Sequence, residues 1–154
     1  MSLVNNIDKY NRITGSLYIG NFESPHDKDF LEENNIKLIV NCTKTYNYRL
    51  PSNIQKIRLN ITDVNTPENN IIIANNIDKI LEIINIYLKS EEGVLVHCHM
   101  GQQRSAAVIV CYLMKYKKLS LKDAINKVKS KRKMAFNPQA TFLDFLQYYE
   151  IEIS

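Results

Sequence analysis

The amino-acid sequence predicts an α/β protein in which a mostly parallel central sheet carries helices on both faces. Two near-continuous apolar runs, at residues 36–42 and 93–96, are typical of strands that are covered on both sides. Segments with apolar residues at helical spacing alternate with the strand segments, and this order builds parallel sheets. Because 154 residues suit a core of ordinary size, we expect residues 1–154 to form a single domain.

The first half of the chain supplies four further elements. Residues 17–19 form a short apolar strand, and residues 27–34 form a short helix. Residues 54–61 alternate apolar and polar side chains, as a half-exposed strand does. Residues 69–88 repeat isoleucine and leucine at helical spacing, so we expect an amphipathic helix there.

The second half is expected to be mainly helical. Residues 105–116 are apolar on nearly every side, which predicts a buried helix. Ser120 begins the next helix, over residues 120–133, with Asp123 three positions further on in an arrangement similar to a capping box. Pro138 fits the first turn of the last helix, where the missing N–H would have no partner in any case.

Composition sets broad limits on partners. The formal net charge of +4 is mild, so it suits anionic substrates without indicating nucleic acid, and we expect no nucleic-acid partner. The basic run at residues 127–133 is better explained as a solvated helix end than as a binding patch. No segment reaches the roughly eighteen apolar residues of a membrane span, so we expect no membrane partner.

Localisation is expected to be intracellular, in the cytoplasm or the nucleus. Residues 1–11 lack the apolar centre of a secretory signal, and three cysteines, an odd number, favour a reducing compartment. The abundance of Asn, Ile and Lys is typical of an AT-rich genome, such as that of a large DNA virus or a protist, in which case the host cytoplasm or the virion is expected.

Residues 97–105, His-Cys-His-Met-Gly-Gln-Gln-Arg-Ser, are the most informative stretch of the chain. A cysteine, five residues and then an arginine stand between an apolar strand and an apolar helix. Such a loop (a P-loop) curls its backbone N–H groups around an anion, and the following helix adds the positive end of its dipole. This arrangement is what attack by sulfur on a phosphate monoester requires. We expect neither a metal nor another cofactor, because adjacent residues of one loop cannot all face one ion.

Each residue type in this loop fits one task. Inward N–H groups favour the anion of Cys98, which can then attack phosphorus and form a cysteinyl-phosphate. Arg104 can bind two phosphate oxygens with its planar fork of donors. Ser105 can donate a hydrogen bond to the sulfur, His97 can orient it from behind, and Gly101 allows close approach of the backbone.

The leaving oxygen needs an acid, and Asp63 is the best candidate. It follows a predicted strand and lies in a polar loop, where movable acids tend to be found. From residue type alone, a simple turn or cap role for Asp63 is the better explanation.

With these motifs, the chain resembles the cysteine-based protein phosphatases, specifically their small (atypical) dual-specificity group. The resemblance covers nearly the whole chain: an opening strand, a strand that ends in Asn, the acid, the P-loop with its helix, and the closing helices. The segments that carry it are residues 12–20, 36–42, 94–105, 111–114 and 120–133, with Asp63, Phe136, Asn137, Pro138 and Phe142. It implies the cysteine-phosphatase fold and hydrolysis of phosphotyrosine and phosphoserine or phosphothreonine in phosphorylated proteins.

The resemblance also implies residue roles. Cys98 is the nucleophile, Arg104 binds phosphate, and Asp63 is the acid and then the base for the attacking water. Ser105 helps the sulfur to leave in the second step. Asn137 supports the loop, although capping of the last helix explains it equally well.

Other residues of the loop are expected to face the substrate. His99 rims the cleft, and Met100, Gln102 and Gln103 are bulkier than the family's usual residues there, which bears on substrate preference. The loop lacks the lysines of phosphoinositide-cleaving relatives. Two alternative functions stay open: a phosphatase of RNA 5′-phosphates or phosphoinositides, and a module that binds phosphorylated proteins with little turnover. The oligomeric state is not predicted.

Cys42 ends a strand that should lie beside the strand leading to Cys98. A reversible disulfide between Cys42 and Cys98 under oxidant would protect the reactive sulfur. A buried cysteine without a redox role is the preferred interpretation, and the disulfide is retained as a hypothesis.

Overall fold

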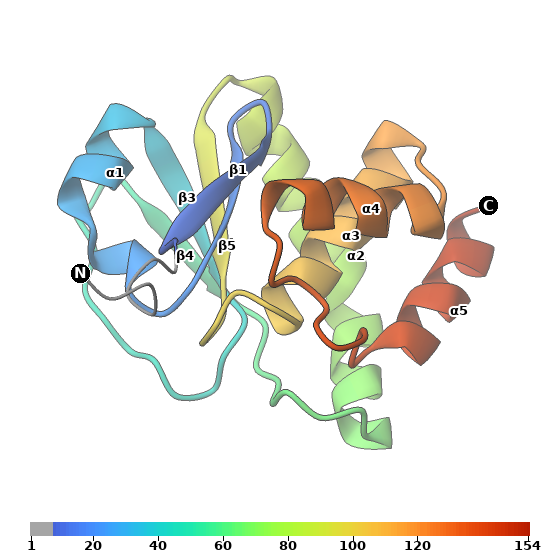
Figure 1. Ribbon diagram of the computed structural model, residues 1–154. Helices are drawn as coiled ribbons and strands as arrows, with labels where there is room; N and C mark the ends of the chain where they lie inside the picture. The colour runs from blue at the N-terminus through green and yellow to red at the C-terminus, as the bar shows by residue number, and fades with distance from the viewer. Residues whose placement is uncertain (1–7) are drawn as a thin grey trace, which may run out of the picture.

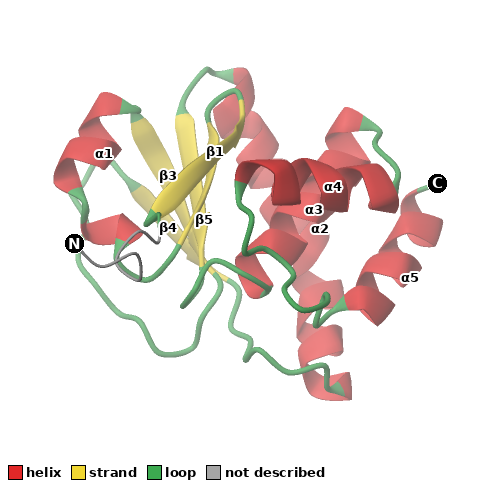
Figure 2. Ribbon diagram, in the orientation of Figure 1, coloured by secondary structure: helices red, strands yellow, loops and turns green. Residues whose placement is uncertain are grey.

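The structure is a computed structural model that describes residues 8–154. A five-stranded sheet stands at its centre, with α1 on one face and α2–α5 on the other (Figures 1 and 2). The bounds of the helical segments are η2 Ser24–His26, α1 Lys28–Glu33, α2 Pro67–Lys89, α3 Arg104–Lys117, α4 Leu121–Lys131 and α5 Leu143–Ile153. The predicted fold class, α/β with helices on both faces of the sheet, is confirmed.

The sheet has the strand order β1-β2-β5-β3-β4. Its strands are β1 Tyr10–Thr14, β2 Leu17–Gly20, β3 Ile36–Asn41, β4 Gln55–Arg58 and β5 Gly93–His97. Only the β1–β2 pair is antiparallel, and the three other pairs are parallel. The central strand β5 is buried along its whole length, as its apolar run predicted.

Two apolar clusters separate the sheet from its helices. The larger one lies between the sheet and α2–α5 and includes the buried apolar residues of α3, a helix that is buried from Ser105 to Met114 as predicted. The smaller cluster lies under α1 and holds only six buried residues, among them Phe30 and Leu31. One face of the sheet is therefore covered far more completely than the other.

Several predicted boundaries are wrong. Residues 12–20, which the resemblance gives as one opening strand, belong to a hairpin of two strands, β1 and β2, and β4 ends at Arg58 rather than at residue 61. The last helix begins at Leu143, so Pro138 lies in the preceding loop and not in a first helical turn. Residues 1–7, part of the segment judged too polar for a secretory signal, lie outside the described residues. Within residues 8–154, none of the helices is long and apolar enough to cross a membrane.

Candidate active site

Residues 98–103 form a loop between the carboxyl end of β5 and the first residue of α3. Its carbonyl groups point outward into the protein. The N–H of Phe22 donates to the carbonyl of His99 at 2.9 Å, and the N–H of Phe136 donates to that of Gln102 at 2.8 Å. Because the N–H and C=O of a trans peptide point in opposite directions, the loop amides face the concave side.

These amides are also unpaired. Within residues 8–154, none of the backbone N–H groups of residues 99–104 has a protein acceptor. Groups of this kind are strong donors that almost always find a partner in folded proteins. A ring of free, converging donors ahead of a helix N-terminus is an anion site. The loop therefore has the form that the sequence predicted.

Arg132 holds the outer side of this loop. Its guanidinium donates from Nε to the carbonyl of Gly101 at 2.8 Å and from Nη2 to that of Met100 at 3.0 Å. The side chain is only 2% exposed, and burial lowers the pKa of its guanidinium. The prediction of a solvated basic run is therefore wrong at this residue. The sequence of this basic run does not indicate that the Arg132 side chain turns inward.

Gly101 has the conformation for which glycine was expected. Its φ is +69°, and a Cβ there would lie 2.7 Å from the carbonyl oxygen of Gly20. Any other residue would be strained and would also push the loop away from β2. The glycine thus allows the tight loop to pack against the sheet.

Cys98 lies at the bottom of the loop and is 2% exposed. Its Sγ is 3.2 Å from the hydroxyl oxygen of Ser105, which is fully buried in the first turn of α3. The predicted contact between this sulfur and this hydroxyl is present. A hydroxyl at this distance can donate a hydrogen bond to a sulfur anion.

Arg104 begins α3 and has an incompletely used guanidinium. Its Nη1 donates to the carbonyl of Ile61 at 3.2 Å, while its buried Nε has no partner within residues 8–154. A buried donor without a partner is costly, and a bound anion would satisfy it. The arginine therefore closes the loop with a donor still available.

His97 lies behind Cys98 and is fully buried. Its Nδ1 is 3.3 Å from the carbonyl oxygen of Cys98, and its Nε2 is 2.6 Å from the hydroxyl of Tyr48. Burial lowers the pKa of His97 to about 4, so the ring is neutral at physiological pH. Burial also raises the pKa of Tyr48, which therefore keeps its proton and can donate it to Nε2. His97 thus contacts the backbone of Cys98 rather than its sulfur.

Asp63 is exposed in the loop between β4 and α2. It lines a groove of about 650 Å³ together with Gln102, Gln103 and Asn137. Asn69, in the first turn of α2, fixes this loop although the sequence did not single it out. Its Nδ2 donates to the carbonyl of Val64 at 2.8 Å and to the hydroxyl of Thr62 at 2.8 Å, so it binds on both sides of Asp63.

The two glutamines of the loop are anchors. Gln103 is buried, donates to the carbonyl of Gln139 at 2.9 Å and accepts from the N–H of Thr141 at 2.9 Å. Gln102 donates to the carbonyl of Met134 at 3.1 Å. Their amide groups bind the protein, while both residues also line the groove beside Asp63, so contact of these side chains with the substrate stays a prediction. Met100 contributes its carbonyl to Arg132, and its side chain is partly exposed.

Asn137 does not cap the last helix, and it contacts the P-loop through its backbone. The last helix is capped by Phe142, so Asn137 is not its N-cap. The Asn137 side chain donates to the carbonyl of Lys133 at 3.2 Å and does not reach the P-loop. Only its carbonyl does so, by accepting from the Gln103 side chain at 3.3 Å.

Aromatic rings form a wall beside the loop. His99 is exposed and stacks with Phe22 at 5.1 Å and with Tyr46 at 5.8 Å between ring centroids. The Tyr46 hydroxyl also bonds to Nδ1 of His99. His99 therefore lies beside the P-loop in a cluster of stacked rings with Phe22 and Tyr46, and its contact with the substrate stays a prediction.

Cys42 follows β3 and is fully buried. Its N–H donates to the carbonyl of His97 at 2.9 Å, and the residues before Cys42 and Cys98 are paired in register across β3 and β5. Neighbouring strands lie about 4.8 Å apart, which is compatible with a disulfide. All three cysteines are free in this structure, and burial raises the pKa of the Cys42 thiol.

Comparisons with known proteins agree with this geometry. A family model described as "Dual specificity phosphatase, catalytic domain" matches residues 17–152. The protein named "Putative tyrosine phosphatase 123R" of Invertebrate iridescent virus 6 is 32% identical over 142 residues, which are 90% of each chain. Human dual specificity protein phosphatase 21 is 31% identical over 96% of this chain and 75% of its own. The crystal structure of human DUSP28 has a TM-score of 0.84 at 25% identity and covers 94% of this chain and 95% of that chain.

Proposed function

The chain belongs to the dual-specificity phosphatases and is a protein phosphatase, and from this premise we propose that Cys98 is the nucleophile that hydrolyses phosphotyrosine and phosphoserine or phosphothreonine monoesters. One observation carries the assignment: the carbonyls of the P-loop are held outward, and the amides of residues 99–104 have no acceptor within residues 8–154. A phosphate dianion provides the acceptors that these donors lack.

The first chemical step is attack in line by the Cys98 thiolate on phosphorus. The sulfur–phosphorus bond forms while the bond from phosphorus to the substrate oxygen breaks, and Asp63 gives its proton to the departing oxygen. Arg104 and the loop amides bind the equatorial oxygens, where charge develops. The step produces a cysteinyl-phosphate and the free alcohol or phenol.

The second step regenerates the enzyme. Asp63, now a carboxylate, takes a proton from a water molecule whose oxygen attacks phosphorus, and inorganic phosphate is released. The sulfur leaves as a thiolate, which the Ser105 hydroxyl, 3.2 Å away, stabilises by donating a hydrogen bond. Neutral His97 holds the Cys98 peptide in place throughout both steps.

The alternatives have less support. A module that only binds phosphoproteins needs the anion cradle but neither a buried cysteine beside a serine nor an acid in the adjoining groove, and both are present. Phosphates of RNA or of inositol lipids would use the same anion site, and no observation of this site favours them over phosphoproteins. We further propose an intracellular, reducing location, because Cys98 has to stay a thiol to function.

The test is replacement of Cys98 by serine. We expect Cys98→Ser to lower turnover of p-nitrophenyl phosphate by at least about 10³-fold, because serine is a far weaker nucleophile at neutral pH. Binding of inorganic phosphate, measured by calorimetry, should persist. Cys111→Ser is the matched control, since Cys111 is equally buried in α3 but lies outside the loop. Turnover that survives Cys98→Ser would refute the assignment of Cys98 as the nucleophile.

A further inference from the structure

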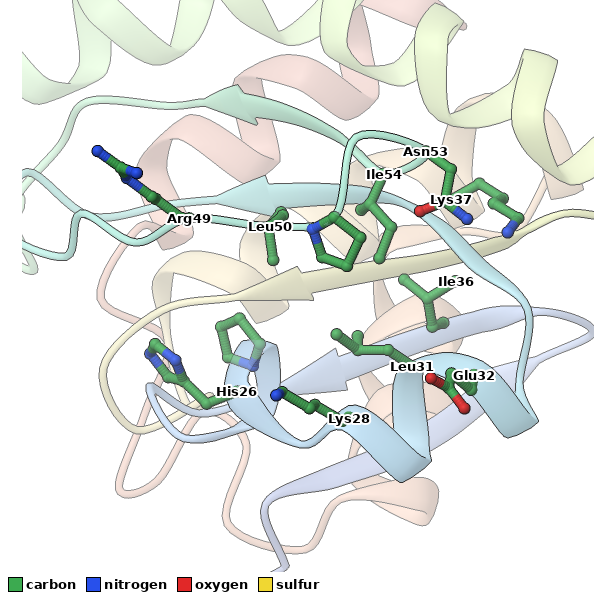
Figure 3. A pocket seen from close by; sticks show the side chains of 12 residues that line it. His26, Lys28, Leu31, Glu32, Ile36, Lys37, Arg49, Leu50, Asn53 and Ile54 are labelled. Carbon is green, nitrogen blue, oxygen red and sulfur yellow. The ribbon is translucent and has the colours of Figure 1, made fainter.

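A second concave site lies on the thinly covered face of the sheet. It runs between α1 and residues 49–54 and has a volume of about 520 Å³ (Figure 3). Its apolar floor is built by Leu31, Ile36, Leu50 and Ile54. These residues belong to the small cluster under α1, whose six buried members leave part of the sheet face without a covering helix. We call this site the α1 groove.

Positive charge surrounds the apolar floor. Lys28, Lys37 and Arg49 lie around the groove, with His26 beside them, whereas Glu32 is the only acidic lining residue in the described part of the chain. Among the ion pairs within residues 8–154, none involves Lys28, Lys37 or Arg49. Three cations therefore stand against one carboxylate in the lining, and none of the three is held in an ion pair.

The groove begins near the active site. In Figure 3, Arg49 and His26 lie toward the end at which the strand arrows finish, and Lys37 lies toward the opposite end. That end of the sheet leads into the P-loop. The His26 ring is in edge contact with Tyr48 at 5.3 Å, and Tyr48 bonds to His97, the residue before Cys98. A chain segment bound in the groove can thus continue toward the phosphate site.

We propose that the α1 groove binds an extended acidic segment of the phosphoprotein substrate, with apolar side chains among the acidic ones, flanking the phosphorylated residue. This inference depends on the proposed function. In an extended segment, alternate side chains point to opposite sides. Apolar side chains can therefore enter the floor while carboxylates meet the cations around it. Charge complementarity selects this occupant over a basic or a neutral segment.

A binding experiment that needs no turnover tests the groove directly. The probe is an unphosphorylated, fluorescein-labelled ten-residue peptide of glutamate and leucine, followed by anisotropy with full-length Cys98→Ser protein. We expect binding that weakens with salt and that falls about tenfold when Lys28→Glu and Arg49→Glu are combined, because both attractions become repulsions. The control pair, Lys89→Glu with Lys122→Glu, reverses two exposed charges on α2 and α4 and should leave binding unchanged.

Turnover gives the second measurement. A phosphotyrosine peptide with the acidic–apolar flank should have a kcat/KM about tenfold above that of a glycine–serine flank, mainly through KM. The groove variant should lose this advantage and keep its rate on p-nitrophenyl phosphate. Equal rates for both flanks, or an advantage that survives in the groove variant, would refute the groove as a substrate site.

Other occupants give different results. Binding to phosphatidylserine vesicles that depends on Lys28 and Arg49, without any peptide effect, would overturn the proposal in favour of a lipid surface. Concentration-dependent dimerisation that Leu50→Asp abolishes would instead indicate a second copy of the chain. Absence of p-nitrophenyl phosphate hydrolysis would refute the proposed function, while the anisotropy measurement would still report on the groove.

Discussion

At the scale of single residues, the anion site depends on one buried arginine outside the loop. Arg132 uses three nitrogens: two donate to the P-loop carbonyls, and Nη1 donates to the carbonyl of Asp8 at 3.0 Å and to the side chain of Asn11 at 2.6 Å. It has no carboxylate partner within residues 8–154. Its charge is therefore directed at peptide dipoles, whose amide ends face the phosphate position.

Replacement of Arg132 by methionine should damage phosphate binding as well as stability. Arg132→Met keeps most of the stem but leaves the carbonyls of Met100 and Gly101 without donors, so we expect phosphate affinity to fall about tenfold or more. Arg132→Lys should restore part of it, because one ammonium can reach one carbonyl. Lys131→Met, an exposed neighbour, is the control. A lower Tm with unchanged phosphate affinity would limit Arg132 to a structural role.

The position of Cys42 allows a test of the reversible disulfide between Cys42 and Cys98. Hydrogen peroxide should oxidise the Cys98 thiolate to a sulfenic acid, which condenses with the Cys42 thiol to form a disulfide and release water. We expect activity to return with dithiothreitol in the natural chain and to be lost permanently in Cys42→Ser, by over-oxidation of Cys98. Peptide mass mapping identifies the bridge. Equal recovery of both proteins would show that Cys42 has no redox role.

At the scale of elements, α2 positions Asp63, the proposed acid. Thr66 caps this helix by accepting from the N–H of Asn69, and the Asn69 side chain then binds both sides of the Asp63 loop. Asn69 is 4% exposed, so its hydrogen bonds are protected from water. The first turn of a long, well-packed helix thus holds the loop that carries the proposed acid.

Substitutions of Asp63, and of Asn69 that holds its loop, should therefore affect substrates with poor leaving groups most. Asp63→Asn should lower kcat at least about 10²-fold for phosphopeptides, whose oxygens need a proton, and much less for activated aryl phosphates. Asn69→Leu should show the same selectivity with a smaller loss of about tenfold, because Asp63 is present but poorly held. Asn76→Leu, on the exposed side of α2, is the control. An equal loss on all substrates would mean that Asn69 acts on stability alone.

Elements with a strong local pattern could be predicted, and those that depend on distant partners could not. The apolar runs of β3 and β5 and the all-round burial of α3 are properties of the segments themselves. Strand β1 forms only because β2 folds back along it. Residues 137–141 stay a loop in which Gln103 binds three backbone groups, so Pro138 does not begin a helix.

The site shows the same division. Cys98, Arg104, Ser105 and Gly101 share one short loop, so their spacing alone brought them together. The partners of this site come from elsewhere: Arg132, at the end of α4, binds the loop, and Tyr48, in the loop after β3, binds His97. These two contacts span 31 and 49 positions of the chain, and no local pattern reports on such contacts.

At the scale of the whole molecule, His97 connects the central strand to global stability. The ring is buried beneath the P-loop, and protonation would place its charge near Arg58, Arg104 and His26, each of which also lowers its pKa. The pKa falls from 6.5 to about 4 on folding, chiefly because of burial. Between these two values the unfolded chain binds a proton that the folded chain does not bind.

The free energy of unfolding therefore rises with pH in this range, because stability rises with pH wherever the unfolded state binds more protons. The contribution of His97 is complete above about pH 6.5, declines as the pH falls toward 4, and amounts to about 3 kcal/mol over that interval. We therefore expect urea unfolding to show a steep loss of stability between pH 6.5 and 4. His97→Gln should be less stable at pH 7 but should lose less on acidification, while His99→Gln should follow the natural chain. Parallel curves for the natural chain and His97→Gln would show that this buried ring is not the group whose protonation destabilises the fold.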